Sequence, residues 1–385
     1  MSIRKALCLE LPQELAEHVF ETLQNDSLSL KYCSLVCRAW LHATRTHLFR
    51  RVILTPQNID PFISIIIDSR STVHSHVRSL ELRRIIISTR WIISNFIPTV
   101  TRLHLCDMTF NTFIDLLDII CSFPCLQFIA LEELTINTNC VSTPIQNKVL
   151  PSSISSVRCR GGCLRPFLLW LLGHSNIPKL SSLDIGPITE KSTFEFGKYL
   201  LCVGPALKHL SLSFDFGHNT HICALQDYYT TALLTAGHAK TNISSVAEHY
   251  KALFGLDTCP NIGTLTGLQS LRLDNFMHFE DHIQATALVW APRIIASNRA
   301  IGLREVILGI SLRRAGEVDI FNIHWNFFDR AFASMDGPFA GLVALKFEIN
   351  GMVNMDGIAS LIRSRLPYCE KRGLLQFCRD LERKS

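Results

Sequence analysis

The sequence predicts an α/β protein in which a small three-helix module is followed by an irregular solenoid, with parallel strands on the concave face and helices outside. Three observations lead to this fold class. Apolar residues recur at helical spacing near the N-terminus, a strand-like apolar pattern recurs from residue 77, and apolar stretches long enough for helices lie between the strands. At 385 residues the chain is too long for one ordinary core, and a small module plus a repeat array suits that length.

The composition indicates a folded chain without a strong electrostatic preference for nucleic acid. Hydrophobic residues make up 48% and charged residues 18%, so burial can offset the loss of chain entropy. The formal charge is only +5 and no long block of Lys and Arg is present, which argues against binding to nucleic acid. The apolar stretches fall short of the ~20 residues of a membrane-spanning helix, and the first ten residues lack a signal-peptide pattern. We therefore expect a cytoplasmic or nuclear protein, or one found in both, with no membrane partner.

The fourteen cysteines are expected to be reduced and mostly buried. Three pairs have three intervening residues each: Cys33/Cys37, Cys121/Cys125 and Cys159/Cys163. None is a CxxC motif, and no matching half with histidines at zinc-finger spacing follows. A histidine-rich metal site could lie at residues 217–221 with His238, but no Cys or carboxylate cluster completes it, and a solvated loop is preferred. The sequence therefore predicts no metal and no cofactor.

Residues 11–50 predict three short helices. Pro12 suits the first helical position and Glu14 suits the first turn. The apolar side chains of this first helix are Leu11, Leu15, Val19, Phe20 and Leu23. Residues 25–27 break the pattern and offer a cap for a second helix, which we expect to run from Leu30 through Trp40. A third short piece carries Thr44, Leu48 and Phe49.

Three blocks of this segment together resemble an F-box, especially the F-box-like domains abundant in fungal proteins. The blocks are Leu11-Pro12-Gln13-Glu14-Leu15, Ser34-Leu35-Val36-Cys37-Arg38-Ala39-Trp40 and His47-Leu48-Phe49-Arg50. The resemblance covers about residues 7–54 and implies docking on the Skp-type adaptor of a cullin–RING ubiquitin ligase, and through it on a cullin. By motif match, the adaptor-binding residues would be Leu11, Pro12, Leu15, Phe20, Leu23, Val36 and Trp40. A plain helical cap on the following domain is the alternative interpretation of these helices.

The repeat pattern consists of an apolar residue, two variable residues, an apolar residue, one variable residue and a third apolar residue. It appears as Val77-Leu80-Leu82, Val100-Leu103-Leu105, Leu126-Ile129-Leu131, Ile154-Val157-Cys159, Leu180-Leu183-Ile185, Leu207-Leu210-Leu212, Leu268-Leu271-Leu273, Leu303-Val306-Leu308 and Leu342-Leu345-Phe347. The first six starts are separated by 23, 26, 28, 26 and 27 residues, a spacing that suits one strand and one helix per repeat. Helices are expected within residues 112–122, 164–172 and 194–201. The strand pattern resembles leucine-rich repeats, which F-box proteins of this type often carry.

The repeats depart from the leucine-rich pattern at one position. Asn or Cys usually stands eight residues after the first apolar position, and here those sites hold Ile85, Met108, Leu134, Gly162, Ile188, Asp215, Phe276, Ser311 and Asn350. Only Asn350 fits, so we expect an irregular solenoid.

The predicted organisation is a helical module at residues 1–54, a connector at 55–76 and the solenoid at 77–385. The 61 residues between the starts at Leu207 and Leu268 hold either a degenerate repeat near 254–259 or an insertion near 227–250. A closing cap follows residue 352, with a helix at 358–362 and a last short strand at 374–377.

Residues that flank the last two apolar positions of each strand point away from the core and would line the concave face, where solenoids commonly bind. The candidate target-binding residues are Glu81, His104, Arg158, Arg160, Asp184, Ser211, Arg272 and Lys346. Their signs are mixed, with a basic patch at Arg158 and Arg160.

The sequence contains no recognisable catalytic motif: it has no GxSxG, P-loop, Rossmann glycine pattern or HExxH. We therefore expect a non-catalytic protein that recognises a substrate for a ubiquitin ligase of the SCF type, with the module on the adaptor and the solenoid on a target protein. The alternative is a ligase-independent repeat scaffold for protein–protein interaction.

Overall fold

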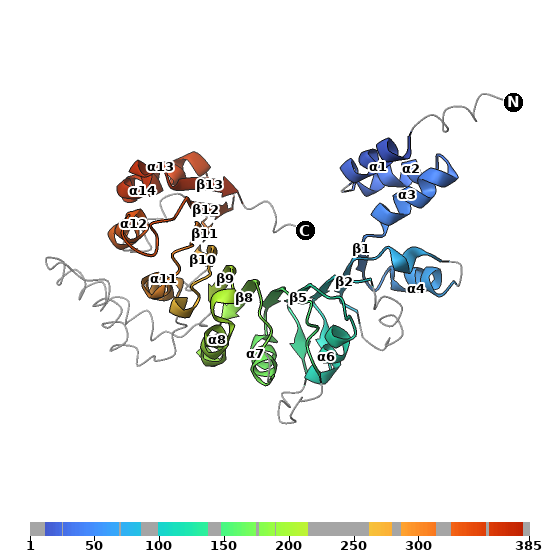
Figure 1. Ribbon diagram of the computed structural model, residues 1–385, viewed down its shortest axis with the longest axis horizontal. Coiled ribbons are helices and arrows are strands. Elements are labelled where there is room, and N and C mark those ends of the chain that lie inside the picture. Colours follow the sequence, from blue (N-terminus) through green and yellow to red (C-terminus); the bar gives the residue numbers. More distant parts are fainter. Residues whose placement is uncertain are drawn as a thin grey trace. The chain divides into compact units, whose positions relative to one another are not determined.

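The computed structural model describes residues 12–24, 26–68, 71–85, 99–137, 148–174, 177–188, 190–214, 262–278, 286–312, 325–351 and 354–379. The chain divides into two compact units, with unit 1 ending at Ile154 and unit 2 beginning at Ser155. Each unit contains parallel strands with helices on one side of them (Figure 1). The coarse prediction of an α/β fold with a parallel sheet is confirmed.

Unit 1 begins with three short helices, α1 (Gln13–Thr22), α2 (Ser27–Ser34) and α3 (Arg38–Leu48). Their core is small. Ala16, Phe20 and Leu30 are buried together, and the ring of Trp40 lies edge-on to that of Phe20 with 5.3 Å between the centroids. So small a core leaves little apolar burial to stabilise these helices.

The second predicted helix is divided in the structure, because residues 35–37 form a turn between α2 and α3. Asp26 caps α2 as expected, since its carboxylate accepts hydrogen bonds from two backbone amides of the first turn. At the other end, Cys37 has an extended backbone (φ −158°, ψ 170°) and precedes the first residue of α3. The turn places Trp40 on α3, where its ring packs against that of Phe20.

The rest of unit 1 is built on a parallel sheet with strand order β1-β2-β3-β5. Its strands are β1 (Arg51–Leu54), β2 (Ser79–Arg83), β3 (Arg102–Cys106) and β5 (Phe128–Glu132), and β4 (Thr109–Phe110) pairs with β6 (Thr135–Ile136) in a second small sheet. The helices are α4 (Ile59–Ile67), the short 3₁₀ helix η1 (Val73–Ser75) and α6 (Phe113–Cys121). Leu80, Leu103 and Ile129 stand side by side in register and are fully buried, as the repeat pattern predicts.

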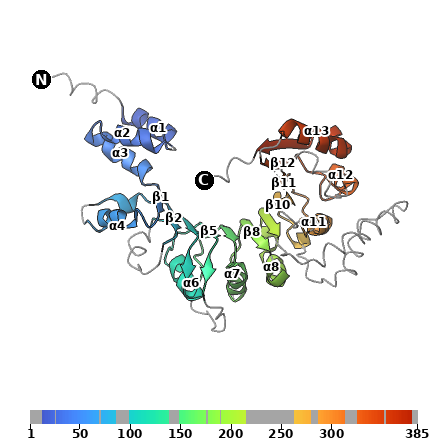
Figure 2. The ribbon, with the colours of Figure 1, turned by 180° about the vertical axis from the view of Figure 1, so that it is seen from behind.

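Unit 2 has a parallel sheet with strand order β7-β8-β9-β10-β11-β12-β13. Figure 2 labels four of these strands, β8, β10, β11 and β12. The strands are β7 (Ser156–Arg160), β8 (Ser182–Ile188), β9 (His209–Phe214), β10 (Ser270–His278), β11 (Glu305–Ser311), β12 (Ala344–Asn350) and β13 (Leu375–Arg379). The helices are α7 (Leu164–Leu172), α8 (Glu190–Val203), η2 (Gly204–Ala206), η3 (Ile262–Thr264), α11 (Thr286–Ser297), α12 (Trp325–Ala333), α13 (Met355–Arg365) and α14 (Pro367–Lys371). The second apolar position of every repeat is again in register across the sheet and buried: Val157, Leu183, Leu210, Leu271, Val306 and Leu345.

In five of the repeats, the position that would hold Asn in a leucine-rich repeat holds a buried apolar side chain instead. Ile85, Met108, Leu134, Ile188 and Phe276 are each at most 6% exposed. The residue before this position has a left-handed backbone in several repeats: Arg84, Asp107, Glu133, Gly161 and Asn275. Four of these repeats, those with Arg84, Asp107, Glu133 and Asn275, turn at the same point and return an apolar side chain to the core, whereas the exposed Gly162 follows Gly161.

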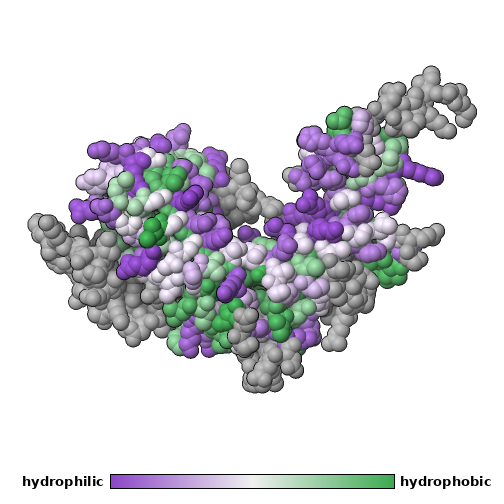
Figure 3. Space-filling model, in the orientation of Figure 1, coloured by the Kyte–Doolittle hydropathy of each residue, from purple (hydrophilic) through white to green (hydrophobic). Residues whose placement is uncertain are grey.

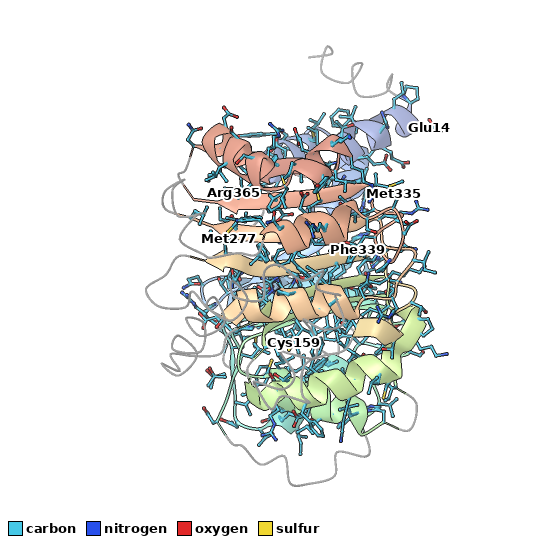
Figure 4. All side chains as sticks on the ribbon, turned by 90° about the vertical axis from the view of Figure 1, so that its left-hand side faces the viewer. Glu14, Cys159, Met277, Met335, Phe339 and Arg365 are labelled. Carbon is cyan, nitrogen blue, oxygen red and sulfur yellow. The ribbon has the colours of Figure 1, made fainter. Side chains whose placement is uncertain are left out.

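The described strands of the two units differ in the regularity of their register. The strand registers of unit 1 run without a shift, whereas in unit 2 the register shifts between Ile185 and Ile188 and between Leu273 and Met277. Met277, on β10, is labelled in Figure 4.

The strand order begins earlier than the predicted solenoid. β1 lies within residues 1–54, which the sequence assigned to the helical module, and α4 and η1 lie within the predicted connector. Near the C-terminus, α13 and β13 correspond to the predicted cap. The predicted insertion at 227–250, the possible degenerate repeat at 254–259 and the histidines at 217–238 lie outside the described residues. Among the helices that the structure describes, none has both the length and the apolar character needed to cross a membrane.

Candidate functional site

A row of charged side chains lies on the strand face opposite the buried leucines in each unit. In unit 1 the row is centred on Glu81 of β2, whose side chain is only 2% exposed. Its carboxylate is 3.1 Å from Nη2 of Arg51 on β1 and forms an ion pair with Nε of Arg83 on its own strand. A contact with His104 lowers the pKa of Glu81 most, and together with both arginines it outweighs burial and brings the pKa to about 2. Glu81 is therefore an ionised, internally paired group.

His104 of β3 lies between two carboxylates from neighbouring strands. Its Nδ1 is 3.8 Å from Oε1 of Glu81, and its Nε2 is 3.1 Å from Oε2 of Glu132 on β5. Burial lowers the pKa of His104, but the two carboxylates outweigh burial and raise it to about 9. Cys106, two residues further along β3, completes a cluster in which one ligand atom each from His104, Cys106 and Glu132 lies within 4.8 Å of the others. These are the residues in the described part of the chain that could hold a metal ion together.

In unit 2 the predicted basic patch at Arg158 and Arg160 is neutralised. Nε of Arg158 lies 2.8 Å and Nη2 of Arg160 lies 3.0 Å from the carboxylate of Asp184 on the adjacent strand. Arg160 also reaches Asp274 of β10, at 2.9 Å. The register partner of Arg160 on the adjacent strand is Gly186. A larger residue would not fit at this position, because a Cβ on Gly186 would overlap the hydroxyl of Ser213. Carboxylates distant in sequence thus face the two arginines of the predicted basic patch, and this surface carries both signs of charge.

The row continues along β10 to β12. Arg272 is 2.7 Å from Asp274 through Nε and forms two contacts, of 2.9 and 2.6 Å, with Glu348. Burial lowers the pKa of Arg272, and the two carboxylates outweigh burial and raise it. Lys346 lies 2.5 Å from Glu305. Most charges of this face are thus paired within the protein.

The candidate target-binding residues all lie on strands, but they differ in accessibility. Glu81 and His104 belong to unit 1, and the other six belong to unit 2. The Glu81 side chain is buried, so its predicted contact with a target is corrected to a role in the ion-pair row. Arg158 and Lys346 are the most accessible of the ion-paired candidates, with side chains 44% and 35% exposed, and Ser211 is half-buried on β9.

The predicted adaptor-binding residues divide into four groups. Leu11 lies outside the described residues. Phe20 is fully buried, so its predicted contact with an adaptor is corrected to a core position. Leu23 and Trp40 are half-buried against that core. Pro12, Leu15 and Val36 are exposed, and Pro12 precedes α1 instead of occupying its first helical position.

The helical module exposes more apolar surface than the motif match included. Its exposed apolar set consists of Leu15, Val19, Leu28, Tyr32, Leu35 and Val36, with exposed fractions between 43% and 81%. Leu15 and Val19 stand four residues apart on α1, as do Leu28 and Tyr32 on α2, so each pair shares one helix face. In Figure 3, hydrophobic atoms interrupt the hydrophilic surface of this module. The four-residue spacing was the available signal for Val19, Leu28 and Tyr32.

Sequence reasoning also missed Arg51, Cys106 and Glu132. Cys106 and Glu132 are register partners at the ends of β3 and β5, and each points to the same face as the residue two positions earlier. The alternation of side chains along a strand could therefore have indicated that both residues lie on the charged face. Arg51 gave no such indication, because β1 fell within the segment interpreted as helical.

Two comparisons with known proteins found no match. No protein-family model matches the chain. A search of curated proteins likewise found no significant match.

The two carboxylates beside His104, first Glu132 and then Glu81, predict a pH-dependent stability of the metal-free protein. The folded-state pKa of His104, about 9, exceeds its ordinary value of 6.5, so its contribution is complete below pH 6.5 and is lost as the pH rises through 9. For Glu81 the contribution is complete above its ordinary pKa of 4.5 and is lost as the pH falls through about 2. The free energy of unfolding, measured with urea, should fall by on the order of 1–3 kcal/mol as the pH rises from about 6.5 to about 9. The His104→Gln protein should lack this alkaline decline, and an unchanged slope in that variant would rule out the assignment.

Proposed function

We propose that this protein recognises substrates for a cullin–RING ubiquitin ligase of the SCF type, with the helical module bound to a Skp-type adaptor and the strand faces bound to a target protein. The observation that carries the proposal is the exposed apolar set on α1, α2 and the turn after α2, in the segment whose three blocks resemble an F-box. A partner of this module would be a folded protein with a complementary apolar surface.

The energetics of the module favour a bound state. Few large side chains are buried inside it, whereas Leu35 is 81% exposed and Tyr32 is 65% exposed. Exposed apolar side chains gathered on a small module are typical of a protein-binding surface, and tyrosine is enriched among residues that contribute most to binding. Association would remove this surface from water, and each Å² of apolar surface buried would stabilise the complex by about 25 cal/mol.

The strand faces support the second half of the proposal. Their charges are paired between neighbouring strands, so the faces are polar and ordered, and the most accessible of the paired groups are Arg158, beside Asp184, and Lys346, beside Glu305. A rigid polar face selects a partner by shape and by the arrangement of charges. The contribution of the chain would be proximity: holding a target near the ligase raises its effective concentration without chemistry of its own.

Reconstitution tests this proposal. The full chain, a Skp-type adaptor and a cullin are purified separately, mixed, and separated by size-exclusion chromatography. The proposal predicts a complex of all three that does not form between chain and cullin when the adaptor is omitted. Failure of the folded chain to enter the complex would favour the alternative function, a ligase-independent scaffold whose exposed apolar set binds an unrelated protein.

A further inference from the structure

We propose that His104, Cys106 and Glu132 form a zinc-binding site on the strand face of unit 1. The three side chains come from β3 and β5 and bring one nitrogen, one sulfur and one oxygen ligand atom within 4.8 Å of one another. This inference does not depend on the proposed ligase function, because the module α1–α3 contributes nothing to the cluster.

The backbone dictates this arrangement. His104 and Cys106 are two residues apart on one strand, so their side chains leave the same face of the sheet. Cys106 and Glu132 are register partners on adjacent parallel strands. Opposite His104 stands Ala130, whose methyl group leaves room for the imidazole and for the Glu132 carboxylate that approaches it. The three ligand atoms converge because of strand pairing and need no loop to order them.

The neighbouring groups suit a metal-bound histidine. Nε2 of His104 is directed toward Glu132, whereas Nδ1 lies toward Glu81. A carboxylate on the second ring nitrogen orients a ligating histidine and fixes the tautomer in which the other nitrogen binds metal. Glu81 is itself held in place by Arg51 and Arg83, so the outer partner of the site is rigid.

The donor set favours zinc over other abundant cations. Imidazole, thiolate and carboxylate are the three ligand types that Zn²⁺ binds in proteins, whereas Mg²⁺ and Ca²⁺ prefer oxygen alone. Zn²⁺ would displace the protons of His104 and Cys106 on binding, and the resulting thiolate and the Glu132 carboxylate carry two negative charges that balance one divalent ion. Three protein ligands leave a fourth tetrahedral position for water or for a group of another molecule.

Metal titration of the full chain tests the site. Calorimetry with Zn²⁺ on chelator-treated, reduced protein should show one site per chain, and Co²⁺ should produce the absorption band of thiolate-to-metal charge transfer. Cys106→Ser and Glu132→Gln should each weaken Zn²⁺ binding by more than about 100-fold, and Cys106→Ser should abolish the Co²⁺ band. Glu81→Gln removes only the outer partner and should weaken binding by about 10-fold.

Cys125→Ser is the matched control, because Cys125 is an exposed thiol of the same unit outside the cluster. It should leave both signals unchanged. Circular dichroism of each metal-free variant establishes that it is folded, and Cys106→Ser changes a single atom of a half-buried side chain. The assignment is overturned if folded wild-type protein binds no Zn²⁺ at one site per chain, or if the Co²⁺ band survives Cys106→Ser.

Discussion

Replacement of Phe20 with alanine should lower the free energy of unfolding of the helical module by about 3–5 kcal/mol. Phe20 is fully buried, and its ring joins Ala16, Leu30 and Trp40 across all three helices. Removing the ring leaves a cavity in a core of few residues, which has little capacity to repack. Hydrogen exchange of the amides in α1–α3 is the measurement, because it reports on the module separately from the sheets.

The exposed Leu28 provides the control for this experiment. Leu28→Ala removes an apolar side chain that is 59% exposed, so protection of the module should change by no more than about 0.5 kcal/mol. Equal effects of the two substitutions would show that Phe20 does not hold the helices together.

Asp274→Asn should destabilise unit 2 by about 3 kcal/mol. The substitution keeps the shape of the side chain but removes the negative charge between two guanidinium groups, Arg160 at 2.9 Å and Arg272 at 2.7 Å. The Asp274 side chain is 2% exposed, so water cannot enter to solvate the guanidinium groups once the negative charge is gone. Asp184 and Glu348 still face the two arginines, and this keeps the loss below the upper end of the range for buried pairs. Urea denaturation followed by circular dichroism measures the change.

An exposed ion pair of the same unit is the matched comparison. Arg363 and Glu370 lie 3.4 Å apart with about half of each side chain exposed, and Glu370→Gln should cost less than about 1 kcal/mol. A loss at Asp274 no greater than at Glu370 would mean that the buried carboxylate is not what stabilises the arginine row.

The strands could be predicted from the sequence because their signal is local. One apolar pattern marks the strands of the repeats, and the structure places its second position in register across each sheet. The helix expected within residues 112–122 follows similarly from its apolar run, and the structure shows that Thr112 caps it. The contact between Phe332 and Phe339 could not be predicted from a local pattern. They pack edge to face, with 5.1 Å between ring centroids, across a connection that carries no repeat pattern (Phe339 is labelled in Figure 4).

The sites could be predicted only in part, because their partners are distant in sequence. The strand period of two indicates that Arg160 leaves the core, but not that Asp274, 114 residues later, neutralises it. In the helical module, apolar spacing alone cannot separate the buried Phe20 from the exposed Val19 beside it. That distinction depends on how α1 packs against α3, which is a tertiary property.

The measurement that tests the central claim most directly is calorimetric titration of a purified Skp-type adaptor into the full chain and into two single variants. Leu35→Glu places a charge at the most exposed member of the apolar set, whereas Met335→Glu places one on a similarly exposed residue of unit 2 (Figure 4). We predict that wild-type and Met335→Glu protein bind alike, and that Leu35→Glu loses about 2 kcal/mol or more, roughly 30-fold in affinity. Absence of binding by folded wild-type chain, or equal binding by Leu35→Glu, would contradict the account.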